Sequence, residues 1–152
     1  MKLFKPLFLL FLLTAFSKSY TQNLFPEKFD NCNTDHFSLE SDTITAKIQD
    51  EQLLNIFKQS FDQKTIDKLR GNLSLQIIVD LEGNSCLISL KNETNIKSKK
   101  LNLKQNIDSN LKWDKPQKKV AAIIVFIFEE NRLKFLRLGI NAKKGVHELS
   151  EN

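Results

Sequence analysis

Residues 71–128 carry an ordered series of hydrophobic patterns that predicts a strand, a tight turn, a second strand, a helix and a third strand. The first pattern alternates apolar residues with a period of two, which is typical of a half-buried antiparallel strand. Its apolar members are Leu73, Leu75, Ile77 and Val79. Asp80 can then accept hydrogen bonds from nearby backbone amides and Gly83 can adopt a positive φ, so a hairpin turn is expected. The chain returns as a second strand through Cys86, Ile88 and Leu90.

A helix is predicted after this hairpin, because apolar residues recur there at every fourth position. These residues are Leu103, Ile107 and Leu111. The remaining face, with Lys104, Asn106, Asp108 and Asn110, is expected to be exposed to solvent. Trp113 follows, and Pro116 ends the helical segment because proline lacks a backbone N–H and disfavours helix in the residue before it. Residues 120–128 are apolar at both alternating positions, which indicates a central strand covered on both faces.

The segment before this series contributes a second helix. Asp50 is expected to cap it, and its apolar face consists of Leu53, Phe57 and Phe61. Residues 43–48 alternate briefly and are interpreted as a short strand. Beyond the apolar strand, residues 133–138 alternate again and predict a further strand joined to it by a hairpin.

These elements predict an α+β fold, with a small antiparallel sheet of three to four strands covered by two helices. A chain of 152 residues suits a single domain, which we place at residues 42–152. Residues 22–41 lack periodicity and are interpreted as an irregular arm.

Residues 1–21 have the layout of a secretory signal peptide. Lys2 and Lys5 precede an apolar stretch at residues 7–13, and small or polar residues follow it. This layout predicts export to the periplasm of a Gram-negative envelope, without a stable membrane span after cleavage. If the leader is retained, the same segment would anchor the protein in the inner membrane.

The charge distribution argues against a nucleic-acid partner. The formal net charge is +5, and Lys2, Lys5 and Lys18 in the leader supply three of these charges. The remaining lysine clusters, at residues 97–100 and 118–119, do not follow one periodic face and carry no interleaved aromatic residues. They are interpreted as solvated loops.

Two cysteines in an exported chain suggest a disulfide between Cys32 and Cys86. The alternative, a buried Cys86 and a free Cys32 thiol, stays open because sequence cannot give the separation of the Cβ atoms. A nucleophilic Cys–His site would need His36 or His147 beside a thiol. No local signature supports it, and the residues around Cys32 lack the four ligands of a structural zinc site. We therefore assign no catalytic, cofactor-binding or metal residues and predict no enzymatic activity.

Taken in order, residues 71–128 resemble the C-terminal domain of TonB-type energy-transducing proteins. The resemblance depends on Gly71, Val79, Asp80, Gly83, Trp113, Pro116 and Phe128. One departure is the proline, which stands one residue further from the tryptophan than is usual in that family. The chain also has only three prolines, so it lacks the proline-rich linker of an energy transducer.

The resemblance implies a protein-interaction module of outer-membrane transport that binds an extended protein segment by strand addition. The implied partner is a segment of an outer-membrane transporter, or a second copy of the chain. The strand at residues 133–138 would cover the edge that the family uses, so Lys134 and Arg137 are the expected exposed residues of the partner-binding edge. An alternative is a carrier of small apolar ligands in the cell envelope, with a pocket lined by Phe57, Phe61 and Phe126.

Overall fold

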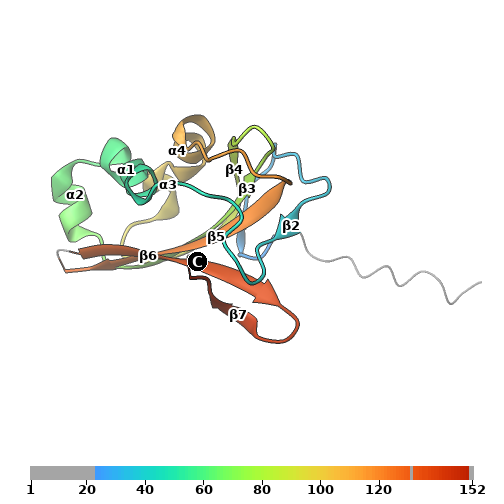
Figure 1. Ribbon diagram of the computed structural model, residues 1–152. Helices are drawn as coiled ribbons and strands as arrows, with labels where there is room; N and C mark the ends of the chain where they lie inside the picture. Colours follow the sequence, from blue (N-terminus) through green and yellow to red (C-terminus); the bar gives the residue numbers. More distant parts are fainter. Residues whose placement is uncertain (1–22, 131, 151–152) are drawn as a thin grey trace, which may run out of the picture.

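The computed structural model describes residues 23–130 and 132–150, so the predicted leader at residues 1–21 lies outside the described residues. The fold is α+β, as predicted, and consists of one curved sheet with the helices on one of its faces (Figure 1). Seven strands form the sheet, in place of the predicted three to four. Short strands of the N-terminal arm and a C-terminal hairpin account for the difference.

The strands are β1 (Glu27–Lys28), β2 (Ser38–Leu39), β3 (Gly71–Val79), β4 (Ser85–Thr94), β5 (Val120–Glu129), β6 (Arg132–Asn141) and β7 (Gly145–Glu148). Their order in the sheet is β1-β4-β3-β5-β6-β7, with antiparallel pairing throughout. The exception is β2, which pairs in parallel with the beginning of β5.

The predicted hairpin between β3 and β4 is confirmed. Gly83 has a φ of +79°. The Asp80 carboxylate accepts hydrogen bonds from the backbone amides of Glu82 and Asn84 at 2.8 and 2.9 Å. The side chain and backbone of the aspartate thereby satisfy the turn amides that no strand can pair.

A bulge in β4 changes the alternation that the sequence predicts. Gln76 pairs with Ser89 and Ile77 with Leu87, so Ile88 is the additional residue. Leu90 consequently faces the helices, whereas Ile88 and Cys86 face the other side of the sheet. The sequence pattern had placed all three residues on one face.

The helices are α1 (Asp50–Ser60), α2 (Gln63–Lys68), α3 (Ser98–Leu101) and α4 (Leu103–Asn110). The helix predicted after Asp50 corresponds to α1, which ends at Ser60 with Phe61 as its C-cap, and α2 was not predicted. Gln49 is the N-cap of α1, so the predicted capping by Asp50 is wrong. Asp62 caps α2 instead, with its side chain accepting from the amide of Thr65.

The main hydrophobic core lies between the helices and the sheet. Its central contact is an edge-to-face pair between Phe57 of α1 and Phe126 of β5, with ring centroids 4.6 Å apart. Both rings are fully buried. Other buried members on this face include Leu53, Leu73, Leu75, Ile77, Val79, Ile107, Trp113, Ile124 and Phe128.

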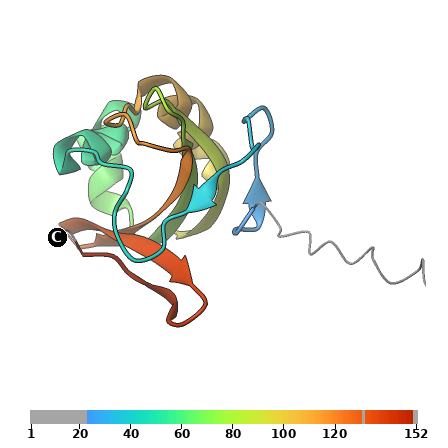
Figure 2. The same cartoon turned by 45° about the vertical axis from the view of Figure 1, so that its right-hand side comes forward.

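The opposite face of the sheet is covered by the N-terminal arm (Figure 2). There Ile78, Ile88 and Ala121 form a smaller buried cluster, against which Phe37 and Leu39 of the arm pack. β3 is therefore buried on both faces rather than half-buried, with Gln76 fully buried. The arm shields residues that the alternating pattern assigned to solvent.

The strand predicted at residues 43–48 does not form. Its backbone amides at Thr45 and Ala46 donate to the Glu40 carboxylate, at 2.7 and 2.9 Å. These amides are satisfied by a side chain, so the segment crosses the end of the sheet as a loop.

Candidate functional site

The outer edge of β6 is open over about half of its length. β7 pairs only with Leu138–Asn141. The backbone amide of Leu149 extends the contact to the carbonyl of Arg137. Within the described part of the chain, no strand pairs with the outer side of residues 132–136. This segment is hereafter the open edge.

The backbone groups exposed at the open edge follow from the ladder. A residue in an antiparallel strand directs its N–H and C=O to the same side, and the side alternates along the strand. The carbonyl of Arg137 faces outward, toward β7. Leu133 and Phe135 precede Arg137 by four and two residues, so their N–H and C=O groups also point away from β5. An extended segment can therefore pair with both residues.

Two apolar hollows flank the open edge, one beside α1 and one beside α2, with volumes of about 420 and 270 Å³. Leu54 and Leu133 line both of them, so the hollows adjoin each other. Their half-buried apolar lining comprises Ile44, Ile48, Leu54, Ile66, Leu133 and Phe135. Side chains at alternate positions of an added strand would reach this lining.

The two residues predicted for the partner-binding edge differ in exposure. Lys134 is exposed on the open edge and forms an ion pair with Glu129 at 3.1 Å. Arg137 is buried, with 6% of its surface exposed, so its expected exposure is wrong. Arg137 is two residues beyond Phe135, so it shares the side of β6 on which Leu133 and Phe135 pack, and it is buried there against a partner far away in the sequence.

That partner is Glu40, which forms a buried ion pair with Arg137. The guanidinium also donates to the carbonyl of Ala46 at 3.0 Å and lies 5.2 Å from the centre of the Trp113 ring. The second carboxylate oxygen of Glu40 accepts the amides of the 43–48 loop, as described above. Arg137 thus fastens the loop to β6, which is a structural role.

The residues that carry the TonB resemblance lie at the two ends of the β3–β5 pair. At one end, Gly71 is directly opposite Phe128 in the ladder. Gly71 has a φ of +103°, and a Cβ atom there would lie 2.2 Å from the carbonyl oxygen of Glu93. At the other end, Val79 is paired with Val120 and precedes the Asp80 turn.

Gly83 and Trp113 contact each other directly at this second end. The amide of Trp113 donates to the carbonyl of Gly83 at 2.9 Å. A Cβ atom on Gly83 would lie 2.2 Å from the carbonyl oxygen of Trp113. The indole donates to the hydroxyl of Ser85 at 2.7 Å, which in turn donates to the carbonyl of Leu111. These contacts join the hairpin to the segment after α4.

The Asp80 carboxyl in this region has a pKa below its usual value. Burial raises the pKa of Asp80, but hydrogen bonds from the side chain and backbone of Asn84 and from the backbone of Glu82 lower it by more. The charge of Lys112 acts in the same direction. The ionised form is therefore favoured by the turn, as expected for a carboxylate that accepts several N–H groups.

Pro116 lies in a separate hollow of about 490 Å³. Its other lining residues are Ile44, Thr45, Lys47, Asp114, Lys115, Gln117 and Lys118. The ammonium of Lys115 is paired with Glu82, which raises the pKa of that lysine. This hollow offers no strand edge and no row of apolar side chains.

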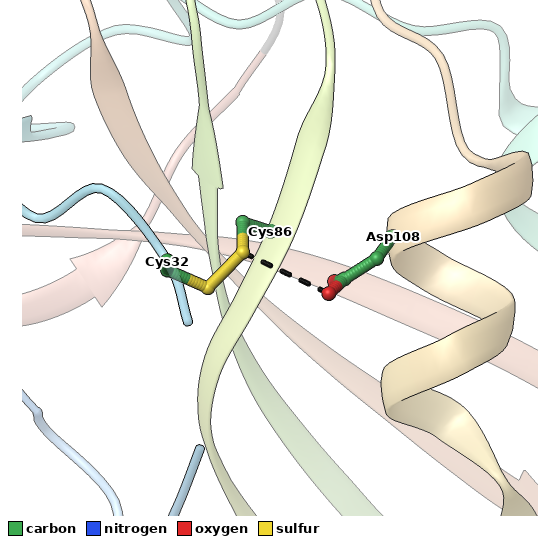
Figure 3. Close-up of side chains that lie close together, drawn as sticks. All are labelled: Cys32, Cys86 and Asp108. Carbon is green, nitrogen blue, oxygen red and sulfur yellow. Dashed lines mark hydrogen bonds between the residues drawn. A yellow bond between two sulfur atoms is a disulfide. The ribbon is translucent and has the colours of Figure 1, made fainter. Parts of the chain in front are cut away.

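Cys32 and Cys86 form a disulfide, which ties the N-terminal arm to β4 (Figure 3). The Asp108 carboxylate on α4 points toward this bond, with one oxygen 3.7 Å from the Cys86 sulfur. Its other oxygen accepts the backbone amide of Leu87 at 2.8 Å. Asp108, which the helical pattern assigned to solvent, thereby fastens α4 to the sheet.

Cys32, Cys86 and Asp108 have ligand atoms within 4.8 Å of one another, as in a metal site. In the disulfide the two sulfurs are bonded to each other, so they do not supply thiolate ligands. The cluster in this oxidised state therefore does not fit a metal ion.

The sequence analysis missed two features of these sites. β7 begins at Gly145, directly after Lys143 and Lys144, and Gly145 has a φ of +67°. That glycine was a readable hairpin signal. Lys104 was assigned to the solvent face of α4, but it contacts both sulfurs of the disulfide. No local pattern could have placed it there.

Comparison of the chain with protein-family models, with curated proteins and with solved structures found no match. Among the described residues, no helix is long and apolar enough to cross a membrane.

Proposed function

We propose that the protein is a non-enzymatic interaction module that binds an extended segment of another protein as an added strand along the open edge of β6. The observation that carries the proposal is the unpaired backbone of Leu133 and Phe135 next to an apolar groove. Backbone pairing gives affinity to such a contact, and the groove selects side chains at alternate positions. The module belongs to the TonB C-terminal-like class by resemblance, with residues 71–128 as the support.

The open edge defines the chemistry of the partner segment. Five residues of a strand extend over about 17 Å, which is enough for two backbone-paired positions. Apolar residues two positions apart would face Leu54 and Phe135. Lys47, Lys58 and Lys134 around the groove are interspersed with Asp50, Asp67 and Glu129, so we expect no strong charge preference.

In this proposal the module is exported, and a periplasmic segment of an outer-membrane transporter is its partner. A second copy of the chain is the other candidate, because two open edges can pair with each other. Of the three residues expected to line a carrier pocket, Phe57 and Phe126 are fully buried in ring contact with each other, and Phe57 borders the hollow of about 270 Å³. Lipid or small molecules that co-purify with the protein would favour the carrier hypothesis.

Peptide display against the purified protein tests the proposal. We expect the selected peptides to share apolar residues at alternate positions and to bind in the same register. Rearrangement of those residues to adjacent positions should abolish binding. In amide hydrogen exchange, the peptide should protect Leu133 and Phe135, because both N–H groups would become paired.

A matched pair of variants separates backbone pairing from side-chain contact. Leu133→Ala and Leu133→Pro both remove the side chain, but only proline also removes the outward N–H. The peptide Kd should be at least about tenfold higher for the proline variant, since one lost hydrogen bond and the displaced strand cost about 1.4 kcal/mol or more. Equal Kd values for the two variants, or protection at β4 instead of β6, would contradict the proposal.

A further inference from the structure

The Cys32–Cys86 disulfide has a cation fixed beside both of its sulfurs. The Lys104 ammonium lies 3.1 Å from the Cys32 sulfur and 3.3 Å from the Cys86 sulfur. Asp108, one helical turn further along α4, pairs with this ammonium at 2.6 Å and holds it in place. The lysine and aspartate side chains are 26% and 28% exposed, and both cysteines are half-buried. The disulfide is therefore only partly shielded from solvent at the level of its residues, and a cation contacts both of its sulfurs.

We infer that this disulfide is a thiol–disulfide exchange site at which Lys104 assists reduction. The partner class is a dithiol reductant. One thiolate of the dithiol attacks one sulfur, a mixed disulfide forms, and the electron pair of the broken S–S bond goes to the other sulfur, which leaves as a thiolate. The second thiolate of the dithiol then attacks the mixed disulfide. The products are an intramolecular disulfide in the reductant and the reduced Cys32 and Cys86, and solvent exchanges the protons.

The position of Lys104 explains why this reaction should be fast. Exchange is faster when the leaving sulfur is stabilised as a thiolate, and an adjacent ammonium provides that stabilisation. Lys104 contacts both sulfurs, but the Asp108 carboxylate lies 3.7 Å from the Cys86 sulfur and opposes negative charge there. Cys32 is therefore the sulfur that leaves with the ammonium beside it. Structural disulfides far from any cation lack this stabilisation.

Reduction would remove the only covalent tie between the arm and the sheet within the described part of the chain. The arm would then be held by its hydrogen bonds and by the packing of Phe37 and Leu39 on Ile78 and Ile88. The exchange site lies at the β4 end of the sheet, whereas the open edge belongs to β6. The inference is therefore independent of the proposed strand addition.

The rate of reduction of the purified, folded protein by dithiothreitol tests the inference. Free thiols are alkylated at intervals and counted by mass spectrometry. We expect Lys104→Met to be reduced about threefold to tenfold more slowly than the unchanged protein. Lys104→Arg, which keeps the charge, should restore most of the rate. Lys100→Met removes an exposed lysine from neighbouring α3 and should leave the rate unchanged.

The direction of the change distinguishes assistance from mere packing. If Lys104 only shielded the bond, its removal would open the site and speed reduction. Reduction of Lys104→Met at the same rate or faster would therefore overturn the inference, as would resistance of the unchanged protein to dithiothreitol below its unfolding transition. If Lys104→Met fails to fold, Lys104→Gln decides, because it also lacks the charge but keeps a polar side chain: its reduction should be slowed by a similar factor, and an unchanged or faster rate would overturn the inference.

Discussion

The two faces of the sheet are covered in different ways. On one face, helices α1 and α4 pack apolar side chains from several elements into a continuous core. On the other face, an arm with only two short strands covers a smaller apolar cluster. The arm depends on individual contacts: the disulfide, and the buried Gln76 and Ser89 side chains that hold its backbone amides.

This difference indicates how the two covers should respond to perturbation. A core of many apolar contacts is lost cooperatively, because each contact depends on the others. A cover held by a few specific contacts can open locally while the rest of the domain stays folded. The helix face should therefore determine the stability of the domain, and the arm face its local dynamics.

The largest effect is expected from Phe57→Ala on the helix face. The substitution removes a fully buried ring that contacts both Phe126 and Phe128. We expect the free energy of unfolding to fall by about 3–5 kcal/mol, measured by urea denaturation. Phe57→Leu should cost clearly less. A loss below about 1 kcal/mol for the alanine variant would contradict the central place given to this ring.

Removal of the disulfide should have the next largest effect. In the double variant Cys32→Ala, Cys86→Ala we expect a loss of about 2–4 kcal/mol, because the bond closes a loop of 54 residues in the unfolded chain. Amide hydrogen exchange should also become faster in the arm than in α1. If both regions changed equally, the arm would not be a separate opening unit.

Ser89→Ala tests one specific contact of the arm. The Ser89 hydroxyl donates to Gln76 at 2.6 Å and accepts the amide of Phe25 at 3.2 Å. Its loss should cost about 1–2 kcal/mol and speed exchange of the Phe25 amide, with little change in α1. Ser74→Ala on β3 is the control, since the Ser74 hydroxyl forms no hydrogen bond with the described residues of the arm. Slower exchange at Phe25 would count against this contact.

The smallest effect is expected from Asp80→Asn, which changes the turn between β3 and β4, two strands that contribute to both faces of the sheet. Since the pKa of Asp80 is lowered by folding, the ionised carboxylate stabilises the protein above the unfolded value of about 3.9. That contribution is lost as the pH falls through the lower pKa of the folded state. We expect the variant to be about 1 kcal/mol less stable at neutral pH and the difference to vanish well below pH 4.

Asp114→Asn is the control for the loss of one carboxylate charge, because the Asp114 side chain is exposed and outside the turn. Its free energy of unfolding at neutral pH should match that of the unchanged protein. A difference between Asp80→Asn and the unchanged protein that persists at low pH would show that the turn depends on shape rather than charge.

Those elements that carry their own periodicity were predictable. β3, the Asp80 turn, α4 and β5 each have a repeating apolar pattern or a turn glycine within a few residues, and the structure confirms all four. In these elements the buried residues recur at a regular spacing, so the local sequence is enough to predict them.

The misplaced features depend on contacts between distant residues. Arg137 was expected among the exposed residues of the strand that covers the family's edge, but it is buried against Glu40, which lies 97 residues away. The same glutamate takes up the amides of the 43–48 loop and removes the predicted strand. The arm was read as irregular because strands of two residues have no periodicity. An ion pair or a disulfide can hold such segments in place although the sequence around them shows no periodic pattern.

The bulge in β4 has a consequence for how this chain tolerates changes in length. Without Ile88, the remaining residues Cys86, Leu87, Ser89 and Leu90 would alternate regularly, each on the face it now occupies. Deletion of Ile88 would therefore preserve the phase of the strand, at the cost of a fully buried side chain of the smaller cluster and of the carbonyl that accepts the amide of Phe29. Deletion of Leu87 would remove a fully buried member of the main core. A one-residue gap among related sequences is thus expected at position 88.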